Sequence, residues 1–130
     1  SGISWTYSDF DGDQQEAWEV KVFDEYTYLS PDFSPNSSNN LFYHKGSDTS
    51  NAVEVNSYLP NVVGTTISDT GFVDGGTYYV AVRVAKKHNK DIFWSEWAYL
   101  QFSTFINQPK PPLISVYTNN TQAMNQISIQ

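Results

Sequence analysis

Strict alternation of side chains around residue 80 constrains this chain more than any other feature. Tyr78, Val80, Val82 and Val84 fall on one face of an extended segment, and Tyr79, Ala81, Arg83 and Ala85 fall on the other. A period of two predicts a β-strand with one buried face. A polar turn over residues 86–91 leads to Trp94-Ser95-Glu96-Trp97 and a second strand that runs to about Ser103. The segment therefore predicts two neighbouring strands of an all-β fold.

The N-terminal part of the chain shows the same period. Ile3, Trp5 and Tyr7 alternate with small polar residues, and Trp18, Val20 and Val22 alternate with Glu19 and Lys21. Shorter strands are expected at 41–43 and near Val53, and a brief one at 65–67. Aromatic residues make up 16% of the chain, which is typical of strands, and no window supports a long helix. These patterns predict an all-β sandwich.

Composition also suggests how the chain is divided. Residues 30–40 are rich in turn formers and predict a long loop, and residues 107–112 contain three prolines and predict a linker. We therefore expect a sandwich over residues 1–106 that lacks its own opening strand. Residues 113–130 are expected to form either the initial strands of a following module or a strand that folds back on the first. The chain is expected to be a piece of a longer polypeptide.

Charge and cysteine content exclude several classes of protein. The formal net charge is −7, so the chain should repel nucleic acid, whose binders need a basic surface. No cysteine is present, which excludes disulfides and thiolate chemistry. No apolar run reaches membrane-spanning length, so no membrane insertion is expected. Lys86, Lys87 and Lys90 are expected to form a solvated turn.

The order of the motifs resembles the fibronectin type III family of immunoglobulin-like β-sandwiches. That family carries an early tryptophan, here Trp5, and a following aromatic and aliphatic strand, here starting at Trp18. Phe72 precedes Tyr78 by six residues, as an apolar residue precedes the family's corner tyrosine. The resemblance implies that the Tyr78 hydroxyl bonds to nearby backbone. The family's usual proline in the corner turn is replaced here by Asp74 and two glycines.

A narrower resemblance concerns function. The run from Trp5 to Val20, with Gly-Gly-Thr-Tyr-Tyr and Trp-Ser-Glu-Trp, is similar to fibronectin-type modules of bacteriophage tail and structural proteins and of bacterial surface proteins. The resemblance implies a non-enzymatic structural or adhesive module of a larger phage virion protein (tail, fibre or capsid-decorating) that acts as a spacer and an interaction surface. Its expected location is the virion, or the extracellular space or cell surface. Its partners would be neighbouring domains, virion proteins, further copies of the chain or cell-surface glycans.

The Trp94–Trp97 motif resembles the W-S-x-W-S box of cytokine receptors, with Ala98 in place of the last serine. That resemblance implies tryptophans stacked on arginines, and Arg83 on the adjacent strand is the candidate cation. The alternative is a sugar-binding platform, which exposed aromatic rings could form. Its candidate residues are Trp94, Trp97, Tyr79, Phe33 and Tyr43. The chain would then be a carbohydrate-binding accessory module of a secreted bacterial hydrolase or adhesin.

Metal binding and catalysis have weaker support in the sequence. Asp9, Asp11 and Asp13 alternate in a way that could bind Ca²⁺, but the EF-hand glycine and glutamate are missing. An ordinary turn is therefore expected there, without a metal or other cofactor. His44 and His88 share no metal-binding spacing, and no carboxylate pair or nucleophile motif is distinguished. No enzymatic activity is predicted.

Overall fold

The computed structural model describes residues 2–54, 76–103, 114–119 and 124–129. Within these residues the chain forms nine strands and one short helix. In chain order they are β1 (Gly2–Ser8), β2 (Gln15–Asp24), α1 (Glu25–Tyr28), β3 (Phe42–Gly46), β4 (Ala52–Glu54), β5 (Thr77–His88), β6 (Asp91–Trp94), β7 (Ala98–Ser103), β8 (Ile114–Asn119) and β9 (Met124–Ile129). The predicted all-β class is thus confirmed.

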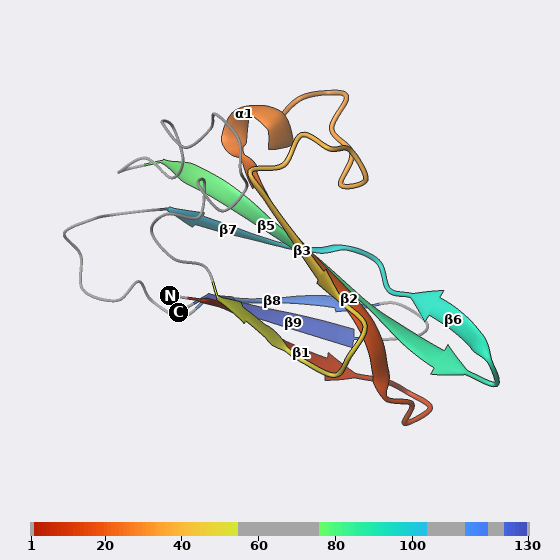
Figure 1. The fold of residues 1–130 in the computed structure, drawn as a ribbon. Helices are drawn as coiled ribbons and strands as arrows, with labels where there is room; N and C mark the ends of the chain where they lie inside the picture. Colours follow the sequence, from red (N-terminus) through yellow and green to blue (C-terminus); the bar gives the residue numbers. More distant parts are fainter. Residues whose placement is uncertain (1, 55–75, 104–113, 120–123, 130) are drawn as a thin grey trace.

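The strands form two antiparallel sheets that face each other (Figure 1). One sheet has the order β4-β1-β9-β8. The other has the order β3-β2-β5-β6, with β7 also paired to β5. The long strands β2 and β5 pair along most of their length and form the centre of the second sheet. The architecture is therefore a two-layer β-sandwich.

The core lies between the sheets and follows the alternation of the sequence. Ile3 and Trp5 of β1 are each 2% exposed, and Val20 of β2 and Val82 of β5 are fully buried. The rings of Trp5 and Trp18 meet across the interior with their centroids 5.4 Å apart. Full burial of one large apolar side chain stabilises a fold by roughly 1.5–3 kcal/mol. The residues predicted to face inward thus supply the contacts that hold the sheets together.

The predicted strand after the 86–91 turn is interrupted. Trp94 pairs with Ala85 and Ala98 with Val82, so three residues, 95–97, lie opposite two residues of β5. This extra residue is a β-bulge. Ser95 maintains the pairing there, because its backbone N–H donates to the Val84 carbonyl (2.8 Å) and its Oγ accepts from the Val84 N–H (3.0 Å).

Strand β9 lies beside β1. It fills the place of the opening strand that residues 1–106 were expected to lack. The pairing is antiparallel and runs from Ile3–Ile129 to Ser8–Met124. The strand nearer the chain's C-terminus therefore covers β1, and β8 lies outside it. As a result, Gly2 and Ile129 are at the same end of the sandwich (Figure 1).

Several predicted features lie outside the described residues. They are Phe72, the first part of the corner turn, the brief strand at 65–67 and the linker at 107–112. The short helix α1 was not predicted; the Asp24 side chain caps it by accepting from the Thr27 N–H (2.7 Å). Among the described residues, no helix has the length and apolar character needed to cross a membrane.

Candidate functional site

Aromatic rings and cations alternate across the outward face of the five-stranded sheet. We call this set, Tyr43, Lys21, Trp97, Arg83 and Trp94, the cation–aromatic ladder. The Lys21 ammonium lies 5.0 Å from the Tyr43 ring centroid and 5.8 Å from that of Trp97. The Arg83 guanidinium carbon lies 4.7 Å from the Trp97 centroid and 4.3 Å from that of Trp94. Each cation is therefore placed between two rings, at distances at which cation–π attraction acts.

Strand register and the bulge together build the ladder. Lys21 of β2 pairs with Tyr43 of β3, so their side chains share one face. Trp94 and Trp97 are three positions apart, and a regular strand would place them on opposite faces. The bulge at 95–97 instead lets both indoles lie against Arg83. Ser95 in the middle of the motif therefore has a structural role, since it completes the backbone pairing where the strand is interrupted.

Polar contacts hold the two cations in place. Arg83 Nη2 donates to Glu19 Oε1 at 2.8 Å, and Glu19 lies directly opposite Arg83 on β2. Lys21 Nζ donates to the carbonyl oxygens of Pro35 (2.8 Å) and Ser37 (3.1 Å). Burial lowers the pKa of Lys21, and nearby Glu19 partly opposes that effect. The ladder thereby fastens part of the long loop before β3 to the sheet.

The two ends of the ladder are accessible to solvent. Trp94 is 36% exposed and Tyr43 is 43% exposed, whereas Trp97 between the cations is half-buried. Burial and the nearby Glu19 carboxylate raise the pKa of the Tyr43 hydroxyl. The terminal rings, Trp94 and Tyr43, can therefore contact an external molecule more readily than the central Trp97 ring can.

Tyr79 and Phe33 lie in a separate aromatic cluster under α1. The rings of Tyr79 and Tyr28 are stacked, with centroids 3.8 Å apart and an interplanar angle of 7°. Phe33 meets Phe23 edge-on at 5.0 Å, and Tyr99 lies beside Tyr28 at 5.5 Å. The platform residues suggested by the sequence are therefore divided: three belong to the ladder, while Tyr79 and Phe33 pack against the chain's own aromatic residues.

The aspartates of the β1–β2 turn surround a lysine. Asp9 Oδ2 accepts from the backbone N–H groups of Asp11 (3.1 Å) and Asp13 (3.0 Å). Lys86 Nζ lies 2.8 Å from Asp9 Oδ1 and 3.1 Å from Asp11 Oδ2. Lys86 is only 3% exposed, so the prediction that it belongs to a solvated turn is wrong. Its long side chain extends the inward row of Val82 and Val84 to the end of the sandwich, where the turn supplies carboxylates.

These contacts perturb the charges of the turn. Burial alone would raise the pKa of Asp9, but the Lys86 hydrogen bond and the backbone N–H groups outweigh it, so the pKa is lowered. The hydrogen bond to Asp9 raises the pKa of Lys86 despite the opposing effect of burial. Tyr7, whose hydroxyl donates to the Asp13 carbonyl at 2.7 Å, has its pKa raised to about 12, mainly by burial. The ion pair is therefore fully charged at neutral pH.

Atoms that could bind a metal come from this turn and from the end of β5. Ligand atoms of Asp11, Asp13 and His88 lie within 4.8 Å of one another. However, Lys86 Nζ is 3.1 Å from Asp11 Oδ2 and 3.6 Å from Asp13 Oδ2, and His88 Nδ1 is 2.8 Å from the latter oxygen. A metal ion there would meet the repulsion of the lysine charge at short range. The arrangement suits the ammonium group of Lys86 better than Ca²⁺.

Of the four residues predicted to be structural, Trp5, Trp18 and Tyr78 lie in the core and Arg83 lies in the ladder. Trp5 Nε1 donates to Gln15 Oε1 (3.0 Å), and Trp18 Nε1 donates to Asp48 Oδ1 (2.8 Å). Tyr78 is buried, with its ring 5.6 Å from that of Phe102. A Cβ at Gly76 would lie 2.7 Å from the Tyr78 hydroxyl, so a larger residue there would force the Tyr78 ring to shift. The implied corner hydrogen bond involves a turn that is mostly outside the described residues.

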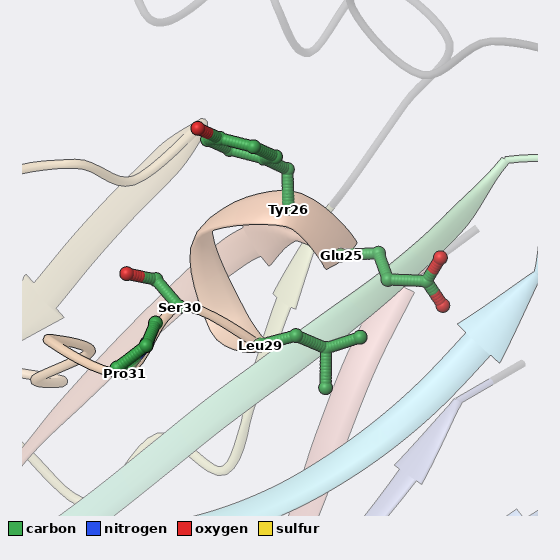
Figure 2. A pocket seen from close by; sticks show the side chains of 5 residues that line it. All are labelled: Glu25, Tyr26, Leu29, Ser30 and Pro31. Carbon is green, nitrogen blue, oxygen red and sulfur yellow. The ribbon is translucent and has the colours of Figure 1, made fainter.

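The sequence did not predict an open hollow that lies beside α1. It is lined by Glu25, Tyr26, Leu29, Ser30 and Pro31, whose side chains surround the single helical turn (Figure 2). Tyr26 is 89% exposed and Leu29 64% exposed. The sequence shows no periodic signal there, because one helical turn is too short to display one.

Comparison with known proteins identified no relative. No family model, curated protein or solved structure matches this chain.

Proposed function

We propose that this chain is a fibronectin type III-like module that serves as a structural and interaction element of a larger virion or cell-surface protein. The cation–aromatic ladder is the observation that carries the proposal. Its cations occupy the faces of the chain's own rings, with Arg83 at 4.3 and 4.7 Å from two indoles. Aromatic residues used in this way make the outer face rigid, and no substrate is needed to explain them.

The mechanism is mechanical. The ladder connects β3, β2, β5 and β6, and Lys21 connects them to the loop at Pro35. At the far end of β5, Lys86 ties the β1–β2 turn to the sheet. A scaffold braced at both places presents its loops in constant positions. The choice of a virion or cell-surface setting rests on the sequence resemblance alone.

The direction of β1 and β9, the two central strands of the four-stranded sheet, favours a decorating role over an in-line spacer. β1 and β9 are antiparallel neighbours, and Ile3 lies opposite Ile129. Polypeptide that continued beyond both strands would leave from the same end of the sandwich. A module attached in this way projects from its host, and neighbouring domains would not be aligned along its long axis.

Carbohydrate binding is the second candidate function, and the exposure of the terminal rings favours it. Trp94 and Tyr43 keep 36% and 43% of their surface accessible, which leaves area for the apolar face of a sugar. On this alternative the ladder would hold the rings for a ligand. The cations would then have both a stabilising and an orienting role.

Replacement of Trp94 separates the two functions. Trp94→Ala removes one ring contact of Arg83, so we expect a stability loss of about 0.5–1 kcal/mol and no change on a glycan array or in cell-wall pull-down. Ile92→Ala, at a 49% exposed position on the same strand, is the matched control. Glycan binding by the unmodified chain that Trp94→Ala abolishes without loss of thermal stability would overturn the structural proposal and support the alternative.

A further inference from the structure

We propose that the hollow beside α1 is a docking site for a basic, partly apolar segment of another protein. The segment would pair a lysine or arginine with Glu25 and place an apolar side chain on Tyr26. The inference rests on the interaction role proposed above and adds a surface and a partner chemistry to it. The test of that role uses Trp94, at a different place on the molecule, so the two can fail separately.

The outer surface of α1 is apolar although it faces solvent. Tyr26 is 89% exposed and Leu29 is 64% exposed. The exposed Pro31 follows the helical turn and lines the same hollow, together with Glu25 and Ser30 (Figure 2). Single exposed apolar residues are common, but a group of them bordered by polar residues is typical of a contact surface.

Packing beneath the hollow fixes its shape. Tyr28 of α1 stacks on Tyr79 of β5, with ring centroids 3.8 Å apart. Phe33, which follows the hollow in the chain, meets Phe23 of β2 edge-on at 5.0 Å. The Asp24 side chain caps the start of the helical turn. A preformed surface loses little conformational freedom when a partner binds, so the exposed side chains are already placed for contact.

The charge around the hollow selects a basic partner. Residues 22–42 contain three acidic residues, Asp24, Glu25 and Asp32, and no lysine, arginine or histidine. The whole chain has a formal net charge of −7. A second copy or an anionic lipid surface would therefore be repelled, whereas a basic segment would be attracted.

Glu25 and Leu29 are placed to bind one basic side chain. They are four positions apart, and their side chains extend to the same side of the helical turn (Figure 2). Lysine and arginine carry their charge at the end of an aliphatic stem, which can lie on an apolar neighbour. A stem on Leu29 would bring the cation to Glu25. The Tyr26 ring would remain for an apolar residue of the same segment.

An array of random peptides tests the chemistry of the partner without assuming its sequence. The tagged full-length chain would be applied to the array, and the peptides that retain it would be identified. We expect these peptides to be enriched in lysine or arginine beside an apolar residue. Retention by peptides without that enrichment, or by none, would overturn the proposal.

Variants of the full-length chain show where the peptides bind. Glu25→Gln and Tyr26→Ser should each weaken binding of the best-retained peptide by about two- to fivefold in fluorescence anisotropy. The matched controls are Glu16→Gln, which removes one exposed charge, and Phe10→Ser, which removes a 93% exposed ring. All four positions are exposed, so the fold should be retained, and both controls should bind as the natural chain does.

General attraction between an acidic chain and a basic peptide is the outcome to be excluded. It would make Glu25→Gln and Glu16→Gln equally weak binders, since each removes one negative charge. That result, or unchanged binding by Tyr26→Ser, would overturn the proposal.

Discussion

Two cations on β5, three residues apart, are accommodated in opposite ways. Arg83 points outward and lies between two indoles, with Glu19 at 2.8 Å. Lys86 continues the inward row and is enclosed by carboxylates, with Asp9 at 2.8 Å. Uncharged rings attract a cation through their quadrupole, which acid does not change, whereas carboxylates provide full charges that acid removes. The Lys86 site therefore depends on carboxylates alone, whereas the Arg83 site combines one carboxylate with two rings that acid does not change.

The comparison predicts where the stability of the molecule depends on pH. The folded-state pKa of Asp9 is lowered. A depressed carboxyl pKa contributes stability that is present above the unfolded value, about 3.9 for aspartate, and is lost as pH falls through the folded value. The rings of the ladder undergo no corresponding change in this range.

The largest expected effect follows from replacement of Lys86. Lys86→Met keeps an aliphatic side chain but leaves Asp9, whose side chain is fully buried, without its cation. Removal of one member of a buried ion pair destabilises strongly because the other charge remains buried. Thermal unfolding should show a greater decrease in melting temperature for Lys86→Met than for Asp9→Asn, Arg83→Met or His88→Gln. Lys87→Met, at the exposed neighbouring position, is the control, and an equal effect of both variants would contradict the assignment.

Asp9→Asn should change the pH dependence as well as the stability. We expect a lower free energy of unfolding at neutral pH, because the charged partner of Lys86 is lost. We also expect a flatter profile below about pH 5, where the natural chain begins to lose this contribution. Urea unfolding measured from neutral to acidic pH provides the test. Asp32→Asn, in the exposed loop, should leave the profile unchanged; a steep profile that persisted in Asp9→Asn would place the acid sensitivity elsewhere.

Arg83→Met should have a moderate effect, and the part of it that comes from the two rings should be independent of acid. It removes two ring contacts and the Glu19 pair, so we expect a loss of roughly 1–2 kcal/mol. Near-ultraviolet circular dichroism should report altered packing of the indoles. Arg83→Lys retains the charge and should recover part of the stability. A loss for Arg83→Met that disappeared at low pH would show that the carboxylate matters more than the rings.

His88→Gln should have the smallest effect. The His88 side chain is 42% exposed, and its Nδ1 forms a hydrogen bond of 2.8 Å with Asp13 Oδ2. Substitution at such a position usually changes stability by less than about 0.5 kcal/mol. Chemical unfolding at neutral pH measures the difference. A much larger change would mean that His88, together with Lys86, determines the conformation of the turn.

Local pattern was sufficient to predict much of the sandwich. The alternation at residues 78–84 identified the inward valines, because burial on one face of a strand imposes a period of two. The same alternation placed Arg83 outward. It could not show that Trp94 and Trp97 share a face, since three-residue spacing in a regular strand places them on opposite faces. The bulge that reverses this expectation depends on pairing with β5.

Other features required contacts between distant parts of the chain. Aromatic character alone places Tyr79 and Phe33 in one group with the tryptophans, but α1 brings Tyr28 onto Tyr79 and separates the two clusters. Lys86 resembled a solvated lysine because its neighbours in sequence are polar. Its carboxylate partners are more than seventy residues away, as the separations of 77 and 75 positions to Asp9 and Asp11 show.

The sequence by itself determined that the chain forms strands and which residues of β1, β2 and β5 face the core, because side-chain periodicity is a local property. Only the tertiary structure decided that β9 completes the edge of β1, that Lys86 is enclosed, and that both tryptophans lie on Arg83. Those outcomes depend on strand register, on a bulge and on charges brought together from separate turns. Local periodicity carries no information about which distant strand or charge will be the partner.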